Sequence, residues 1–215
     1  MKVKLASEYG FCFGIKNAVK IAEENPGASV IGDIMHNPEE KARLARDFNV
    51  TTQSSLDIEP GQTAIIRPHG IAQPIEKNLS SRGVVLKDAT CPNVKAIHKK
   101  IHQLDSQGYQ IILLGDANHP EVLGEVSYAR KPVTVVKNLA ELKSLNINLD
   151  GQKIALLAQT TQNPNNFHDI ERFLRERTDK PSINNTICNA TYNKHMAVLN
   201  LLKDIDVGVV VGGRH

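Results

Sequence analysis

Three cysteines are the residues of this sequence most suited to bind a metal centre. Cys12, Cys91 and Cys188 each begin a segment with the pattern of a helix, and the sequences after Cys12 and Cys91 resemble each other. A thiol at a helix N-terminus lies in a positive local field, which favours the thiolate that binds metals. A free cysteine is also commonly a small buried hydrophobe. Three cysteines in matched positions instead favour one shared site.

The ligand set favours an iron–sulfur cluster over zinc. Structural zinc normally takes four protein ligands in closely spaced pairs, and the sequence contains no Cys-x-x-Cys. A cluster held by only three cysteines leaves one iron open to substrate, which is typical of a catalytic cluster. The sequence therefore predicts a catalytic cluster and no simple electron carrier.

Internal repetition extends beyond the cysteines. The motif Gly-Asp-x-x-His occurs at 32–36 and again at 115–119, after apolar segments in both cases. A second apolar segment with a polar end follows in each repeat, ending at 67–70 and at 159–161. Repeated sequence motifs of this kind indicate repeated structural units. It predicts α/β units related by a pseudo-threefold axis, with domain boundaries 1–90, 91–187 and an incomplete third unit at 188–215.

The histidines fall into two groups. Those that follow apolar strands lie where α/β folds place ligand sites, and a converging set of them suits a phosphate or diphosphate. These are His36, His69, His119 and His215. In contrast, His98 and His102 lie in a helical pattern beside two lysines, and we interpret them as a solvated face although their spacing could hold a metal.

Three further polar residues have open interpretations. Glu121 follows His119 just inside a predicted helix, where it is either an ordinary first-turn acid or a catalytic one. Thr160 and Thr161 end a predicted strand, where threonines often make simple hydrogen bonds.

Composition limits the remaining possibilities. The 215 residues carry a net charge of only +3, with few aromatic residues and no tryptophan, so nothing indicates nucleic-acid binding. No stretch approaches the length of a membrane span. The odd cysteine count, with no apolar segment after Met1, indicates a reducing cytoplasm. Short apolar runs alternating with amphipathic stretches predict parallel strands covered by helices, including strands at 2–6 and 207–212 and a helix at 190–203.

Seven short motifs, in order over essentially the whole chain, resemble the LytB/IspH family. They are residues 10–14 (Gly-Phe-Cys-Phe-Gly), 35–37 (Met-His-Asn), 67–70 (Arg-Pro-His-Gly), 88–92 (Asp-Ala-Thr-Cys-Pro), 119–122 (His-Pro-Glu-Val), 159–161 (Gln-Thr-Thr) and 188–191 (Cys-Asn-Ala-Thr). The resemblance implies a trefoil of three α/β units around a central 4Fe-4S cluster, held by Cys12, Cys91 and Cys188.

The resemblance also implies an activity. Members of the family are oxidoreductases that reductively dehydroxylate 4-hydroxy-3-methylbut-2-enyl diphosphate, the last step of the methylerythritol phosphate route of isoprenoid biosynthesis. It implies that Glu121, Thr160 and His119 are catalytic, and that His36, His69, His119 and Thr160 bind the allylic diphosphate. The electron donor would be ferredoxin or flavodoxin, because no flavin or nicotinamide fingerprint is present.

One departure from the family pattern leaves alternatives. The family continues with a Ser/Asn-containing turn and a further serine, whereas this sequence stops at His215, so we expect a C-terminally truncated chain. An inactive fragment that still binds a cluster is therefore one alternative. An iron–sulfur hydro-lyase of another family is a second, and it would need no electron donor.

Overall fold

The computed structural model describes residues 2–212, which divide into two compact units. Unit 1 comprises the described residues up to Pro68, together with Leu79–Cys91 and those from Cys188 onward. Unit 2 comprises His69–Asn78 and Pro92–Ile187. The division falls inside one helix, α3 (Gln73–Ser81), so part of α3 belongs to each unit. The domain boundaries predicted after residues 90 and 187 refer to repeated units of the sequence, and they stay a prediction.

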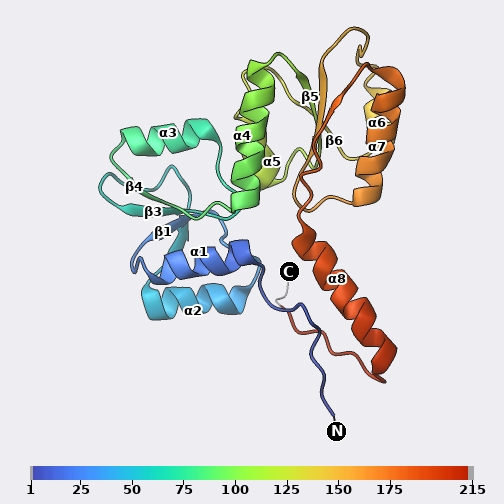
Figure 1. The fold of residues 1–215 in the computed structure, drawn as a ribbon. Coiled ribbons are helices and arrows are strands. Elements are labelled where there is room, and N and C mark those ends of the chain that lie inside the picture. The colour runs from blue at the N-terminus through green and yellow to red at the C-terminus, as the bar shows by residue number, and fades with distance from the viewer. Residues whose placement is uncertain (1, 213–215) are drawn as a thin grey trace. The chain divides into compact units, whose positions relative to one another are not determined.

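Unit 1 is built on a parallel sheet. Its strands are β1 (Ser29–Ile31), β2 (Thr51–Gln53), β3 (Thr63–Ile66) and β4 (Val85–Asp88), in the order β2-β1-β3-β4. Two helices, α1 (Phe13–Glu23) and α2 (Pro38–Phe48), lie together on one face of the sheet (Figure 1).

Local sequence explains how these helices begin and how they face the sheet. Ala18 and Ala22 are one helical turn apart in α1 and both are fully buried in the core of unit 1. Asn37 caps α2, because its Oδ1 accepts a hydrogen bond from the Glu40 N–H at 3.0 Å, and Pro38 occupies the first helical position.

Unit 2 repeats this arrangement around a second parallel sheet. Its strands are β5 (Gln110–Leu114), β6 (Thr134–Val136), β7 (Ile154–Ala158) and β8 (Ser182–Ile183), in the order β6-β5-β7-β8. The helices that cover it are α4 (Pro92–Ser106), α5 (Pro120–Val126), α6 (Leu139–Ser144) and α7 (Pro164–Arg177).

Helices cover both faces of the sheet in unit 2. Ile112 and Leu114 of β5 join a core cluster with residues of α6 and α7, whereas Ile111 and Leu113 join a second cluster with residues of α4 and α5. Figure 1 shows α4 and α5 on one side of these strands and α6 and α7 on the other. Alternate residues of a strand point to opposite faces, so a strand buried on both sides must be apolar throughout. The predicted α/β class with parallel sheets is confirmed.

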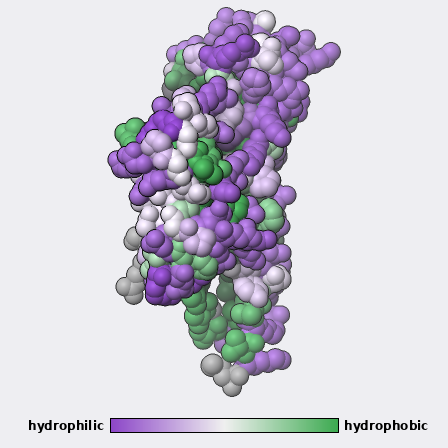
Figure 2. All heavy atoms as spheres, turned by 90° about the vertical axis from the view of Figure 1, so that its left-hand side faces the viewer, coloured by the Kyte–Doolittle hydropathy of each residue, from purple (hydrophilic) through white to green (hydrophobic). Residues whose placement is uncertain are grey.

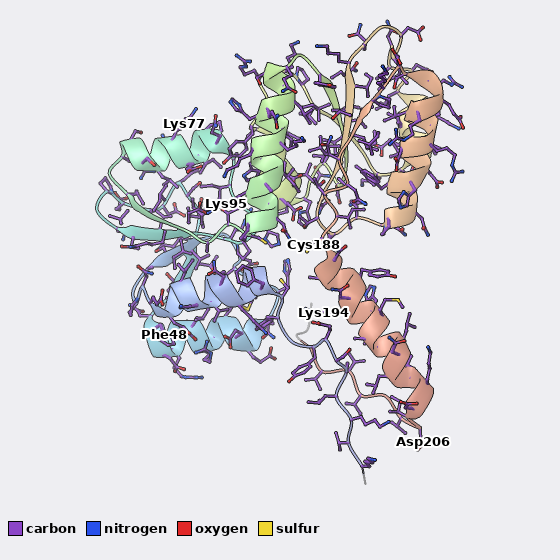
Figure 3. The ribbon with its side chains drawn as sticks, in the orientation of Figure 1. Phe48, Lys77, Lys95, Cys188, Lys194 and Asp206 are labelled. Atoms are coloured by element: carbon purple, nitrogen blue, oxygen red, sulfur yellow. The ribbon has the colours of Figure 1, made fainter. Side chains whose placement is uncertain are left out.

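The residues from Cys188 onward form the long helix α8 (Asn189–Leu201) and a short 3₁₀ turn, η1 (Leu202–Asp204). The helix predicted at 190–203 is therefore confirmed. Its residues contact the N-terminal segment, since the Lys194 ammonium donates to the Gly10 carbonyl at 2.6 Å and Lys4 pairs with Asp204 at 3.3 Å. Figure 3 labels Cys188 at the start of this helix and Lys194 further along it.

The strands predicted at 2–6 and 207–212 are wrong for the described residues, where neither segment forms a strand. A strand needs a neighbour to pair with its backbone, and no described strand pairs with either segment. Their apolar side chains are accordingly exposed, including Val3 (73%) and Val210 (94%). Figure 2 shows hydrophobic side chains at the surface among a mostly hydrophilic face.

Candidate functional site

Each of the three cysteines stands at the start of a helix, as the sequence predicted. Cys12 is the N-cap residue of α1 and Cys188 is the N-cap residue of α8, and neither side chain makes a capping hydrogen bond. Cys91 directly precedes Pro92, the first residue of α4. None of the three is in a disulfide within the described residues, and all are of intermediate exposure. Their sulfur atoms are therefore in the positive field of helix N-termini and not sealed in a core.

Gly14 brings two of these thiols close to each other in unit 1. A Cβ atom on Gly14 would lie 2.9 Å from Cys91 Sγ and 4.0 Å from Cys12 Sγ, so both sulfur atoms border the space that this glycine leaves open. The Cys91 N–H also donates to the Pro68 carbonyl at 2.9 Å, which fixes the Cys91 backbone to the end of β3. Cys91 and Cys12 therefore pack closely around a glycine, where a larger side chain would not fit without a shift of Cys91.

No complete metal site is assembled in the part of the chain that the structure describes. Within residues 2–212, no three or more His, Cys, Asp or Glu side chains are gathered closely enough to hold a metal ion. The sharing of one cluster by Cys12, Cys91 and Cys188 therefore stays a prediction.

Charged residues of unit 1 gather at the carboxyl edge of its sheet. Ile31 of β1 is paired with Ile66 of β3, so the residues that follow these strands lie at the same edge. A hydrogen bond from Lys41 at 2.9 Å lowers the pKa of Asp33, and the charges of His36 and Arg67 lower it further. His36 is thus exposed at a charged strand end, as predicted, and its role in substrate binding is untested.

Arg67 was not singled out by sequence reasoning, although it lies in one of the quoted motifs. Its guanidinium passes close to Gly32, whose φ of +71° suits glycine and whose missing Cβ would lie 2.5 Å from Arg67 Nη1. Burial lowers the pKa of Arg67, which marks it as a half-buried cation at the strand end. The signal in the sequence was an arginine directly after an apolar strand.

Unit 2 brings Glu121 and Thr160 into direct contact. Leu114 of β5 is paired with Ala158 of β7, so the segments after these strands lie at the same carboxyl edge. The Thr160 N–H donates to Glu121 Oε1 at 2.6 Å and the Thr160 hydroxyl donates to Oε2 at 2.8 Å. Glu121 is only 2% exposed and Thr160 only 7%. An ordinary first-turn acid would be solvated, whereas Glu121 is buried and hydrogen-bonded; its catalytic role stays a prediction.

His119 contacts the backbone of Glu121, and His69 contacts the ring of His119. His119 is the N-cap residue of α5, and its Nδ1 accepts a hydrogen bond from the Glu121 N–H at 3.1 Å. Because Nδ1 accepts, the ring proton is on Nε2, which is left as a donor. The ring of His69 meets that of His119 edge to face, with 5.5 Å between centroids. Unit 2 therefore combines two imidazoles, a buried carboxylate and a threonine.

The structure corrects the prediction for His98 and adds Glu125, which the sequence analysis did not consider. His98 was expected on a solvated face, but it is 5% exposed and its ring stacks on Tyr128 with 4.1 Å between centroids; His102 is exposed, as expected. The lysines beside His98 suggested a polar face, whereas only the packing of α4 against α5 places His98 inside. Glu125, fully buried one turn after Glu121, was missed entirely. Finally, His215 lies outside the described residues.

Comparison with known proteins gives a consistent picture. The family model for the LytB protein matches residues 3–215. The protein of Campylobacter hominis named 4-hydroxy-3-methylbut-2-enyl diphosphate reductase is 44% identical over 216 residues, covering 100% of this chain and 78% of that protein. The protein of Helicobacter pylori (strain P12) with the same name is 41% identical, covering 100% of this chain and 77% of its own length.

Solved structures agree with these sequence matches. A structure of (E)-4-hydroxy-3-methyl-but-2-enyl diphosphate reductase, described as the terminal enzyme of the non-mevalonate pathway, superposes with a TM-score of 0.85 at 36% identity. The alignment covers 99% of this chain and 77% of that one. A Plasmodium falciparum reductase gives a TM-score of 0.85 at 27% identity, over 96% of this chain and 67% of that one. The chain belongs to the LytB family, and its fold is that of these reductases.

Proposed function

We propose that this chain is a 4-hydroxy-3-methylbut-2-enyl diphosphate reductase, an oxidoreductase of isoprenoid biosynthesis. The substrate, two electrons and two protons would give isopentenyl or dimethylallyl diphosphate and one water molecule. The family and the names of its relatives support this activity. The observation in the structure that carries it is the double hydrogen bond of Thr160 to the buried carboxylate of Glu121.

Cys12, Cys91 and Cys188 would hold the cofactor that this reaction needs, a 4Fe-4S cluster. When bound, such a cluster supplies electrons and an open iron for the substrate hydroxyl group. The places of Cys12 and Cys188 at helix N-termini and the closeness of Cys12 and Cys91 around Gly14 support that role. No helix of residues 2–212 is long and apolar enough to cross a membrane. We propose a reducing cytoplasmic location, because the cysteines must stay free, and ferredoxin or flavodoxin as the electron donor.

Glu121 would deliver a proton, and Thr160 would hold its carboxyl group in place. The two hydrogen bonds from Thr160 occupy one lone pair on each Glu121 oxygen and fix the plane of the carboxyl group. A fixed carboxyl group loses no orientational freedom at the moment of proton transfer. Burial of the pair excludes competing water from this carboxyl group.

His119 and His69 would bind the diphosphate. With Nδ1 held by the Glu121 N–H, His119 can donate from Nε2 to a phosphate oxygen. His69 is held against the ring of His119 and adds a second imidazole to the same group. His36 stays a third candidate for this role, because it is exposed after β1 in unit 1.

The proposal is tested by changing Glu121 to Gln in the reconstituted protein. Glu121→Gln keeps the size of the side chain and can still accept from the Thr160 N–H, but its NH₂ group must donate to the Thr160 hydroxyl, and the transferable proton is removed. Turnover should fall by about 10²–10⁴-fold, the usual share of general acid catalysis. Iron content, measured in the same preparations, should be unchanged.

Two outcomes would contradict this mechanism. A fall in turnover of less than about threefold, well below the usual share of an acid catalyst, would return Glu121 to an ordinary first-turn acid. Turnover of the unchanged protein without any reductant would favour the hydro-lyase, because that reaction needs no electrons.

A further inference from the structure

Glu125 is a buried acid for which the proposed function has no role. Its side chain is 0% exposed, and no described residue makes a hydrogen bond of ordinary geometry to either carboxyl oxygen. Buried polar groups in native proteins are nearly always hydrogen-bonded, because an unsatisfied group loses its solvation without compensation. A buried carboxyl group in this state is costly, so its presence needs an explanation.

Glu121 lies one helical turn before Glu125 in α5, on the same face of the helix. Two buried carboxyl groups at this spacing cannot both be ionised without strong repulsion. Thr160 donates two hydrogen bonds to Glu121, which stabilise the ionised form of that group. Glu125 receives no such donor, so the single proton of the pair belongs on Glu125.

The neighbours of Glu125 agree with this assignment. Burial, as the largest cause, and the neighbouring Glu121 side chain together raise the pKa of Glu125 to about 9. Helix α4 packs against α5 and carries two buried titratable groups, His98 and Asp105. The His98 ring stacks on Tyr128, and the Asp105 carboxylate is held by the backbone N–H groups of Arg130 and Lys131.

Strands β5 and β7 also pack against α5, and the residues that they place in this cluster are apolar. A further segment against α5 contains His69 and Ile71. Its backbone carbonyl oxygens would lie 3.6 to 3.7 Å from a Cβ on Gly124, next to Glu125 in the chain. The titratable group of that segment is His69, whose ring lies against His119. Within residues 2–212, the charge that acts on the pKa of Glu125 is therefore that of Glu121.

We propose that Glu125 stores the proton that Glu121 delivers, and so acts as a positioning and relay residue for Glu121. This proposal rests on the proposed function. The proton would leave the carboxyl oxygen of Glu125 and bind an oxygen of Glu121, so that Glu125 becomes the carboxylate and Glu121 the acid; no electrons move in this step. After Glu121 has given the proton to the substrate, the pair would regain one proton from water.

The protonation of the pair can be measured without substrate and without turnover. Difference infrared spectroscopy of the protein should show the carbonyl stretch of a protonated carboxylic acid at neutral pH. That band should disappear as the pH rises through about 9. Glu125→Gln should remove the band, and Glu121→Gln should keep it but lower its titration midpoint, because the neighbouring charge is gone. Glu176→Gln, which changes an exposed acid of α7, is the matched control and should change nothing.

Turnover tests the relay itself. Glu125→Gln should lower kcat by at least about tenfold, below the effect of losing Glu121. Glu125→Asp keeps an acid and should restore part of the loss, which a purely structural role would not predict. Iron content should be the same in all variants.

Each outcome has a defined meaning. A wild-type spectrum without the band at neutral pH, or a band that survives Glu125→Gln, would overturn the assignment of the proton. An unchanged kcat in Glu125→Gln, with a large loss in Glu121→Gln, would overturn the relay but leave the proposed function standing. Full turnover in Glu121→Gln would contradict the acid role of Glu121, and the relay with it, while the infrared result would stand on its own.

Discussion

The buried acid Glu125 should make the stability of this protein fall as the pH rises. Its pKa is raised from 4.5 to about 9 in the folded protein, with burial as the largest cause. At a pH below 4.5, the pKa of Glu125 in the unfolded chain, both states are protonated and Glu125 causes no loss of stability. Between the two values the native state keeps a proton that the unfolded state has lost, so the free energy of unfolding decreases with pH.

The size of this effect follows from the shift. One pKa unit corresponds to about 1.4 kcal/mol, so the penalty at pH 7 amounts to about 3 kcal/mol and grows further towards the folded pKa. Glu125→Gln removes the titrating group and keeps a side chain of similar size. The free energy of unfolding of the variant, relative to that of the wild type, should therefore rise by about 1.4 kcal/mol for each pH unit in this range. Any stability difference that the amide group itself causes is the same at each pH, so it does not change this dependence on pH.

Urea unfolding followed by circular dichroism, at about pH 5, 7 and 8.5, measures the difference directly. Glu176→Gln is the control, because the Glu176 carboxyl group is exposed and its removal should give the same small difference at each pH. A difference between Glu125→Gln and wild type that is constant with pH would refute the reasoning. A difference that moves in favour of the wild type as the pH rises would refute it as well.

Two further substitutions test other parts of the structure. Gly14→Ala places a methyl group 2.9 Å from Cys91 Sγ, so it should lower the iron bound on anaerobic reconstitution well below about four per chain. Full iron content in Gly14→Ala, with Lys16→Ala as the control, would contradict this close contact. Asp105→Asn weakens the hydrogen bonds from Arg130 and Lys131, and should cost about 1–3 kcal/mol in urea unfolding. Those bonds lower the pKa of Asp105 despite its burial, so the loss should shrink below pH 4; a loss that stays constant would contradict this.

Much of the fold could be predicted from local sequence. The two parallel sheets follow from short apolar runs between amphipathic stretches, and β5 and β7 are apolar throughout because helices cover both of their faces. Asn37 before Pro38 marked the start of α2, and the cysteines marked the starts of α1 and α8. Such signals are local, because capping and helix periodicity depend on residues within one or two turns.

The failures in the fold have a different cause. Residues 2–6 and 207–212 have the composition of strands, but a strand forms only where another strand accepts its backbone hydrogen bonds. The short strands β2 and β8 were missed for the complementary reason, since β1 and β7 supply their pairing while their own sequences carry little signal. Strand formation is therefore a property of pairs of segments.

The same distinction between local sequence and contacts of distant segments applies to the candidate site. The sequence by itself determined which residues have the right chemistry: three cysteines at helix starts, histidines after strands, Glu121 and Thr160. Only the tertiary structure decided that Thr160 donates twice to Glu121, that Gly14 leaves space beside Cys91, and that Glu125 and His98 are buried. The physical reason is that residue type and spacing set what a side chain can do. Burial and hydrogen-bond partners, which set its protonation state, come from segments far apart in the chain.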